Sequence, residues 1–199
     1  MMISINNLCL VRDGKKIINN FSLNVSTGSI TVIIGPNGCG KSTLLSAIAG
    51  DILPSSGEIK IDNVPLNLYS AKALAKKRAV VIQNPIYTLG FSVRQVIKMA
   101  GPADEVMKEL ALLDITDQAV TTLSGGQIQK VAIAAALAQR TPLLILDEPL
   151  SGQDVQSRKR LIKILQSRAQ AGNTVVVVAH SDEKNLSWAH KIVKFPLLS

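Results

Sequence analysis

Two stretches of the chain are continuous apolar runs bounded by polar residues. They are LLIL at residues 143–146 and TVVVVA at residues 174–179, the second rich in β-branched side chains. Runs of this kind are typical of parallel strands that are buried on both faces. Residues 30–34 form a similar run, followed by a glycine-rich loop and then by LLSAIAGDIL, which has helical apolar spacing. This order of strand, loop and helix predicts an α/β fold with a parallel core sheet.

The remaining pattern predicts an antiparallel β subdomain at the start of the chain and helices in its middle. Strands are predicted over 3–11 and 21–25, with the turn-like DGKK between them, and further strands over 55–61, 79–82 and 191–195. Helical residues run from 92 to 121 with breaks at Gly101–Pro102 and near Asp114, and longer helices are predicted over 125–140 and 155–171. We therefore expect residues 1–199 to form one domain that carries a short helical subdomain over about 92–140.

Composition supports a folded chain with a basic surface. Of the 199 residues 47% are apolar and 18% are charged, which is unlike a disordered sequence. The formal charge of +8 suits nucleic acid, an anionic membrane surface or a polyphosphate ligand. Aromatic residues make up only 3% of the chain, so few rings are available for stacking on bases and no nucleic-acid partner is expected.

The chain shows no signal for export or for a disulfide framework. No apolar run reaches the roughly 18 residues that span a bilayer, and the N-terminal segment is polar where a signal peptide is apolar. The two cysteines, Cys9 and Cys39, fit a reducing compartment. We expect Cys9 in the core. Cys39 is expected to be a small side chain that fits between two glycines, the alternative being an activated thiolate at a helix N-terminus. Trp188 is expected to pack beneath the last strand.

A phosphate-binding loop lies between the predicted strand at 30–34 and the helix that follows. The segment GPNGCGKST matches the pattern G-x-x-x-x-G-K-[ST] in the structural context that the pattern needs. Its glycines allow backbone amides to surround phosphate oxygens, its lysine neutralises them, and its serine offers a ligand to Mg²⁺. The predicted nucleotide-binding residues are Gly35, Pro36, Asn37, Gly38, Cys39, Gly40, Lys41, Ser42 and Thr43.

Two carboxylates follow the buried run at 143–146. Asp147 stands at its carboxyl end and Glu148 comes next, within LLILDEP. We expect Asp147 to bind Mg²⁺ through water. Glu148 is expected to orient or deprotonate the attacking water, because phosphoryl transfer depends on positioning and charge neutralisation.

LSGGQ at residues 123–127, read alone, is a helix N-cap and a turn. Together with the phosphate loop, LLILDEP and a downstream His180, however, it makes the sequence similar to the ATP-binding-cassette ATPases. The motifs occur in the order of that family, GPNGCGKST, Gln83, LSGGQ, LLILDEP, SGQD and His180, and they extend over nearly the whole chain. The resemblance implies the cassette fold of P-loop NTPases, with the helical subdomain inserted in a RecA-like core, and ATP and Mg²⁺ as cofactors.

The resemblance also implies roles for single residues. Gln83 would meet Mg²⁺ and the attacking water, and His180 would hold the γ-phosphate and Glu148 in register. The aromatic residue that stacks on adenine in this family is missing, and Val11 and Arg12 occupy that stretch. Arg12 is expected to stack through its guanidinium plane instead.

In this family two cassettes pair head to tail around ATP. The resemblance therefore implies a homodimer in which residues of one copy reach the nucleotide of the other or cross the interface. A serine hydroxyl and glycine amides at a helix start form an anion site, which agrees with that arrangement. The residues expected across the dimer are Ser124, Gly125, Gly126, Gln127 and Asp154.

Residues 48–100 most resemble the ATPases of importers for heme, ferric siderophores and cobalamin. The cues are AGD, LA-x-x-RAVV-x-Q and FSV-x-x-VI-x-M. The resemblance implies integral membrane permease subunits as partners and a place at the cytoplasmic face of the membrane. The chain ends soon after residue 195, so it is also similar to the compact ATPase of the cytochrome c heme exporter. Two hypotheses outside transport are a soluble cassette ATPase that acts on nucleic acid or ribosomes and a nucleotide-binding regulator without turnover.

Overall fold

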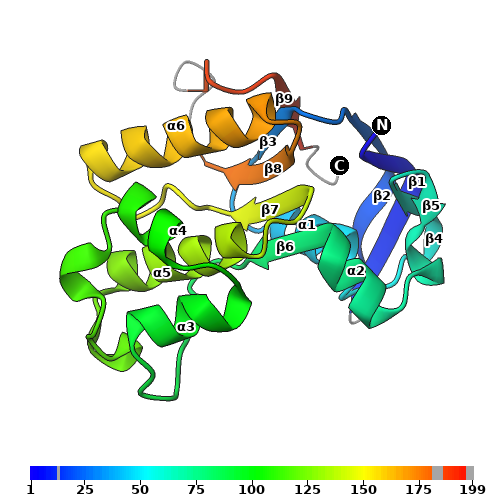
Figure 1. Cartoon of the computed structure of the whole chain (residues 1–199). Coiled ribbons are helices and arrows are strands. Elements are labelled where there is room, and N and C mark those ends of the chain that lie inside the picture. Colours follow the sequence, from blue (N-terminus) through cyan, green and yellow to red (C-terminus); the bar gives the residue numbers. More distant parts are fainter. Residues whose placement is uncertain (13, 181–185, 196–199) are drawn as a thin grey trace.

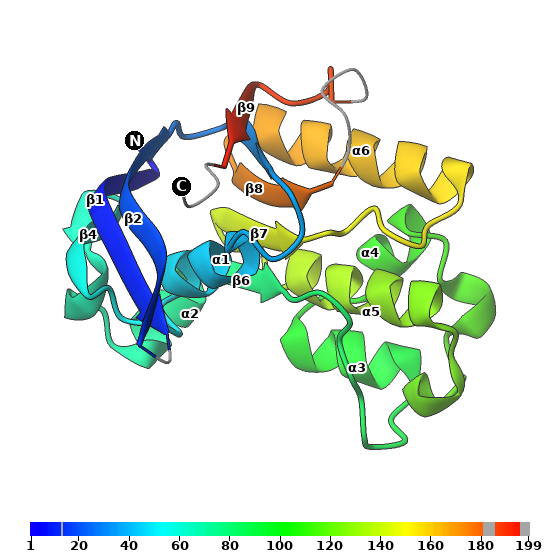
Figure 2. The same cartoon turned by 180° about the vertical axis from the view of Figure 1, so that it is seen from behind.

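A computed structural model describes residues 1–12, 14–180 and 186–195, and within them the strands form two sheets (Figure 1). The α/β fold predicted from the sequence is confirmed, with one antiparallel and one parallel sheet. Both views place the antiparallel sheet to one side of the molecule and helices α3 to α6 on the other (Figures 1 and 2).

The antiparallel sheet contains β1 (Ile3–Arg12), β2 (Lys15–Val25), β4 (Ser56–Ile61) and β5 (Val64–Pro65), in the order β2-β1-β4-β5. The predicted second strand, 21–25, was too short, because β2 already begins at Lys15. Lys15 pairs with Arg12 and Lys16 with Val11, so two residues of the predicted DGKK turn belong to the strand. Asp13 of that turn lies outside the described residues. Cross-strand pairing extends β2 here, over residues that show no apolar alternation.

The parallel sheet contains β3 (Ile30–Ile34), β6 (Arg78–Val81), β7 (Leu143–Asp147), β8 (Thr174–Ala179) and β9 (Lys191–Lys194), in the order β6-β7-β8-β3-β9. All its neighbouring strands run parallel. Every residue of β7 and β8 is buried, as the two continuous apolar runs predicted. Since the strands are parallel, their carboxyl ends lie at one edge of the sheet.

The helices are α1 (Lys41–Ala49), α2 (Ala71–Lys77), α3 (Val93–Ala100), α4 (Asp104–Glu109), α5 (Gly125–Ala138) and α6 (Val155–Gln170), with short 3-10 helices η1 (Leu66–Leu68), η2 (Leu113–Ile115) and η3 (Val120–Thr122). The predicted helices at 125–140 and 155–171 match α5 and α6 within two residues. The predicted break at Gly101–Pro102 separates α3 from α4. Helix α2 was not predicted, because Leu74 is its single buried residue and gives no apolar periodicity.

Each face of the parallel sheet has its own apolar core. Alternate strand residues such as Val32 and Leu146 face α3 to α6, whereas Ile33 and Ile145 face α1 and the antiparallel sheet. Trp188 is buried in the first core together with Ile192 of β9, which agrees with its expected place by the last strand.

Cys9 is a correction to the sequence analysis, because it is only partly buried and does not belong to either core. Its sulfur accepts a hydrogen bond from the Asn20 amide at 3.3 Å. Leu8 and Leu10 on either side of it are buried, so the alternation of side chains along β1 places Cys9 on the opposite, less covered face of the sheet.

Close backbone packing and a partly buried ion pair join helices α3 to α6 to one another. A Cβ added at Gly101 would lie 2.1 Å from the carbonyl oxygen of Ala138, so the end of α3 approaches the end of α5 without a side chain between them. Arg168 of α6 contacts Glu109 of α4 at 3.3 Å. No helix within the described ranges is both long enough and apolar enough to cross a bilayer.

Candidate active site

Four parallel strands deliver the predicted catalytic and phosphate-binding segments to one edge of the sheet. Gly35 follows β3, Gln83 follows β6, Glu148 follows β7 and His180 follows β8. Because β7 and β3 both pair with β8, the phosphate loop and the two carboxylates flank the same central strand. Crevices at the carboxyl ends of parallel strands are where open α/β sheets bind ligands.

The backbone of the phosphate loop requires glycine at two places. Gly38 has a φ of 75° and Gly40 a φ of 100°, in the left-handed region that favours glycine. A Cβ at Gly40 would also lie 2.7 Å from Cγ2 of Ile17 in β2. Gly40 is the N-cap of α1, so the loop places the free amides of a helix N-terminus at the tip, where Pro36, Asn37 and Gly38 are exposed.

Lys41 lies under this loop and is 5% exposed. Its Nζ donates to the carbonyl oxygens of Gly35 at 2.6 Å and Pro36 at 2.7 Å. The ammonium group is thus held at the mouth of the loop, where phosphate oxygens can take over from the carbonyls as acceptors. Thr43 follows within the first turn of α1.

Asp147 and Ser42 meet beside the loop. The Asp147 side chain is buried, and its Oδ1 has no hydrogen-bond partner among the described residues. Burial raises the pKa of this carboxyl, while a hydrogen bond with Ser42 acts in the opposite direction. One carboxylate and one hydroxyl are a suitable oxygen donor set for Mg²⁺, which takes its other ligands from phosphate and water. Within the described ranges no three His, Cys, Asp or Glu side chains form a metal site of their own.

Glu148 is held by neighbours on both sides. Its Oε2 accepts a hydrogen bond of 2.8 Å from Nε2 of Gln83, and its Oε1 contacts Nε2 of His180. Its amide donates to the Val178 carbonyl of β8 at 3.0 Å. Glu148 has a φ of 48°, which is uncommon for a residue with a side chain and costs conformational energy. The predicted catalytic trio is thus brought together by the structure.

Cys39 lies within the phosphate loop, and Arg12 lies at the end of β1. The Cys39 side chain is buried, and a Cβ added at Gly35 would lie 3.0 Å from its sulfur, so this side chain fills the inside of the loop. This agrees with the expected packing role rather than with an accessible thiolate. Arg12 ends β1 on the exposed side of the antiparallel sheet, opposite Lys15. Stacking of Arg12 on adenine stays a prediction.

Ser124 begins α5 with a capping box. The Ser124 amide donates to Oε1 of Gln127 at 2.9 Å, and the Gln127 amide donates to Oγ of Ser124 at 3.4 Å. Gly125 and Gly126 form the first turn and line a cavity of about 320 Å³ together with Gln83, Glu148 and Gly152. No residue of the phosphate loop lines this cavity.

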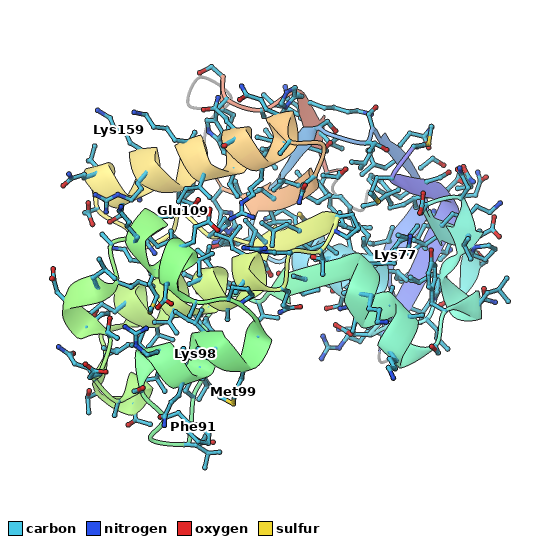
Figure 3. The ribbon with its side chains drawn as sticks, viewed as in Figure 1. Lys77, Phe91, Lys98, Met99, Glu109 and Lys159 are labelled. Carbon is cyan, nitrogen blue, oxygen red and sulfur yellow. The ribbon has the colours of Figure 1, made fainter. Side chains whose placement is uncertain are left out.

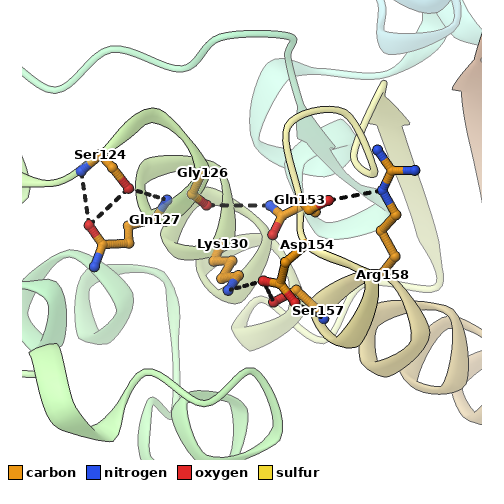
Figure 4. Close-up of polar contacts among 8 residues, drawn as sticks. All are labelled: Ser124, Gly126, Gln127, Lys130, Gln153, Asp154, Ser157 and Arg158. Atoms are coloured by element: carbon orange, nitrogen blue, oxygen red, sulfur yellow. Dashed lines mark hydrogen bonds and ion pairs between the residues drawn. The ribbon is translucent and has the colours of Figure 1, made fainter.

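Asp154 begins α6 in the same way and joins it to α5. Its Oδ1 accepts from the Ser157 amide at 2.8 Å, its Oδ2 accepts from the Ser157 hydroxyl at 2.6 Å, and Nζ of Lys130 lies 3.8 Å from Oδ2 (Figure 4). The hydrogen bonds from Ser157 lower the pKa of Asp154 to about 2.

Gln153 is a residue that the sequence analysis missed. It is 8% exposed, its Nε2 donates to the Gly126 carbonyl at 3.3 Å, and its own carbonyl accepts from Nε of Arg158 at 3.0 Å (Figure 4). A glutamine in SGQD gives no sign of burial by itself, because the contact joins segments that are far apart in sequence. A larger cavity of about 850 Å³, lined by Asp51, Arg78 and neighbours, contains none of the predicted site residues.

Comparison with known proteins now assigns the family. The family model described as ABC transporter matches residues 18–151, which is more than half of the chain. This chain belongs to the ABC transporter family. It is an ATP-binding subunit that hydrolyses ATP, as the phosphate loop and the Gln83–Glu148–His180 cluster led us to expect.

Individual relatives and structures agree with the family. The hemin import ATP-binding protein HmuV of Rhodococcus jostii is 34% identical over 94% of this chain and 68% of its own length. The spermidine/putrescine import ATP-binding protein PotA of Pseudomonas aeruginosa is 37% identical over 88% of this chain and 51% of its own length. A dimeric ATP-binding cassette in a post-hydrolysis state with ADP and Pi has a TM-score of 0.85 at 27% identity, covering 98% of this chain and 94% of that one.

Proposed function

We propose that this chain is the ATPase of an importer for hemin or a related metal chelate. It would act at the cytoplasmic face of the membrane as a homodimer beneath two permease subunits. The observation that carries the proposal is the contact of Glu148 with both Gln83 and His180 at the edge that also bears the phosphate loop. The cargo class is supported by similarity to several hemin import ATP-binding proteins.

In the proposed reaction water attacks the γ-phosphorus of ATP, the bond to the β-phosphate oxygen breaks, and ADP and phosphate leave. Lys41 and the amides that follow Gly40 neutralise the phosphate oxygens. Glu148 accepts a proton from the attacking water, and His180 contacts the γ-phosphate. The neighbouring Gln83 keeps the carboxylate directed at that water.

Magnesium fits the oxygen atoms that the chain offers beside the loop. The Ser42 hydroxyl and Oδ1 of Asp147, which is buried without a partner among the described residues, would hold Mg²⁺ directly or through water. Gln83, which contacts the neighbouring Glu148, would be a further ligand. When bound, the ion supplies positive charge to the β- and γ-phosphate oxygens.

The homodimer would complete each nucleotide site from two copies. In a single chain Gly125 and Gly126 line a cavity with Glu148, and no residue of the phosphate loop of that chain lines it. The hydroxyl of Ser124 and the amides of this helix start therefore lie where they can serve a γ-phosphate on a second copy. Gln127 shapes the turn through the capping box, and Asp154, which lies 3.8 Å from Lys130 of the same helix, would lie at the interface between the copies.

An apolar surface on the helical region is suited to a permease. Ile86, Leu89, Phe91 and Met99 are 84%, 63%, 39% and 66% exposed, and they lie on α3 and on the segment that joins Gln83 to it. Figure 3 shows Phe91 and Met99 at the same end of the molecule, with Lys98 beside them. A permease loop bound here would reach Glu148 through Gln83 at the start of the segment.

Co-purification from native membranes in mild detergent tests this function. We expect a polytopic permease with the tagged wild-type chain, and its loss with Met99→Asp. Val64→Asp, at an exposed site of β5 on the antiparallel sheet, is the matched control and should retain the permease. Recovery of only ribosomal or nucleic-acid components would contradict transport.

The identity of the permease would test the cargo. The similarity to both a hemin and a spermidine/putrescine import protein means that the cassette alone does not distinguish cargo. A partner of about ten spans would support the importer of metal chelates, whereas a smaller partner would favour a heme exporter.

A further inference from the structure

Gln153 connects two parts of the site that are far apart in sequence. It stands on the segment between Glu148 and α6, and its side chain is almost fully buried against the start of α5. The Gly126 carbonyl that it contacts belongs to the helix turn whose amides we assign to the γ-phosphate on a second copy. In the proposed homodimer the first turn of α5 binds the nucleotide of the partner copy, whereas Glu148 acts on the nucleotide of its own copy. The hydrogen bond from Gln153 to Gly126 therefore links the two nucleotide sites within one chain.

Three further observations make this connection a tight one. A Cβ added at Gly126 would lie 3.4 Å from the Gly152 carbonyl oxygen, so the space between the two backbones beside the hydrogen bond is no larger than one methyl group. The Ser151 amide donates to the Glu148 carbonyl at 3.1 Å, which turns the segment back on itself. On the far side, Lys130 of α5 pairs with Asp154 at 3.8 Å.

The direction of the hydrogen bond matters. The Gly126 carbonyl points along α5 away from the helix start, whereas its amide is at the exposed end. A donor on that carbonyl fixes the peptide plane without occupying the amide. Arg158 fixes the other end of Gln153 by donating to its carbonyl at 3.0 Å (Figure 4).

We propose that Gln153 is a positioning residue that makes the first turn of α5 and the Glu148 segment of the same copy move as one body when ATP closes the dimer. This inference rests on the proposed ATP-bound homodimer. Through it, engagement of Gly126 by the γ-phosphate of one nucleotide is transmitted to Glu148 at the other, so the two sites close together.

Gln153→Met tests the inference, because methionine keeps the length and volume of the side chain and removes its donor. The variant is made in a Glu148→Gln background, where we expect dimers to accumulate, and the ATP concentration for half-maximal dimer is measured by light scattering. Without the bond the two segments must be ordered relative to each other when the dimer forms, and an ordering cost of about the size of one net hydrogen bond predicts a rise of about three- to tenfold. ATP binding by the monomer at the phosphate loop should stay within about twofold, a result that general loss of structure would not give.

Matched variants separate the outcomes. Gln170→Met, at the exposed end of α6, should leave the ATP concentration unchanged. Gln153→Glu keeps the size of the side chain and replaces the donor with an acceptor, and it should raise the ATP concentration at least as much. It also serves as the second variant if Gln153→Met does not fold.

The result that overturns the inference is equal dimer formation by the Gln153 variants and Gln170→Met. Failure of Glu148→Gln alone to dimerise is a different result. It would contradict the proposed ATP-bound dimer and would remove the basis of the inference with it.

Discussion

Nε2 of Gln83 donates to Oε2 of Glu148 at 2.8 Å, across a sequence separation of 65 residues. The two residues follow neighbouring parallel strands, β6 and β7, so the sheet itself sets their distance. Gln83 also begins the segment that leads to the exposed apolar surface of α3. The same side chain therefore lies between the candidate general base and the proposed permease surface.

Removing the Gln83 amide should lower turnover more than ATP binding. In Gln83→Ala we expect the ATPase rate to fall about tenfold, because Glu148 loses one of its two orienting contacts, while the Kd for ATP changes by less than about twofold. Steady-state ATPase assays and equilibrium nucleotide titration measure the two effects. Gln170→Ala is the control, and an equal loss of binding and turnover would refute an orienting role.

Lys41→Ala should remove phosphate affinity. The variant deletes the ammonium group held by Gly35 and Pro36, so we expect the Kd for ATP to rise by about tenfold or more. Lys98→Ala, on α3, provides a matched loss of charge away from the loop. Near-normal nucleotide binding by Lys41→Ala would count against the phosphate-loop assignment.

Ser124→Arg should leave each chain able to bind ATP and should prevent dimer formation. The large side chain would occupy the surface that we assign to the second nucleotide, and loss of the cap of α5 should lower the free energy of unfolding by about 1 kcal/mol. Gel filtration with ATP and an ATPase assay read the effect, with Ser167→Arg on α6 as control. Unchanged ATPase activity would rule out a site shared by two copies.

Protonation of Asp154 in acid should lower the free energy of unfolding. Its pKa is about 2 in the folded chain and roughly 3.9 when unfolded, so the folded state prefers the ionised form. The stabilisation is complete above about pH 4 and is lost as the pH falls toward 2. Asp154→Asn keeps a capping side chain that does not titrate. Denaturant unfolding from pH 5 to pH 2.5 should show the wild type losing stability relative to this variant, and a constant difference would be contrary to the account.

The sequence predicts the elements whose residues carry their own signal. Continuous apolar runs predicted β7 and β8, and the glycine spacing predicted the phosphate loop. Helix α2, which buries only Leu74, and the first half of β2, which pairs without an apolar pattern, depend on tertiary neighbours. The partial exposure of Cys9 depends on which face of the antiparallel sheet is covered, because the buried Leu8 and Leu10 on either side point to the other face.

The same distinction between local sequence signals and tertiary contacts holds in the active site. Motif residues such as Asp147 and Glu148 were predicted because chemistry constrains their type and spacing. The contact between Gln153 and Gly126 was not, because it joins α5 to the segment after β7 and either residue alone is unremarkable in sequence.

The central claim is that Glu148 activates water for ATP hydrolysis between two copies of the chain, and Glu148→Gln tests it most directly. The purified variant would be compared with wild type and with Glu58→Gln, which changes a carboxylate of β4 that pairs with Lys60, for ATPase rate and for mass by light scattering with ATP and Mg²⁺. We predict a rate at least about a hundredfold below wild type, unchanged ATP binding and an ATP-dependent dimer. A monomer in ATP, or turnover near that of wild type, would contradict the account.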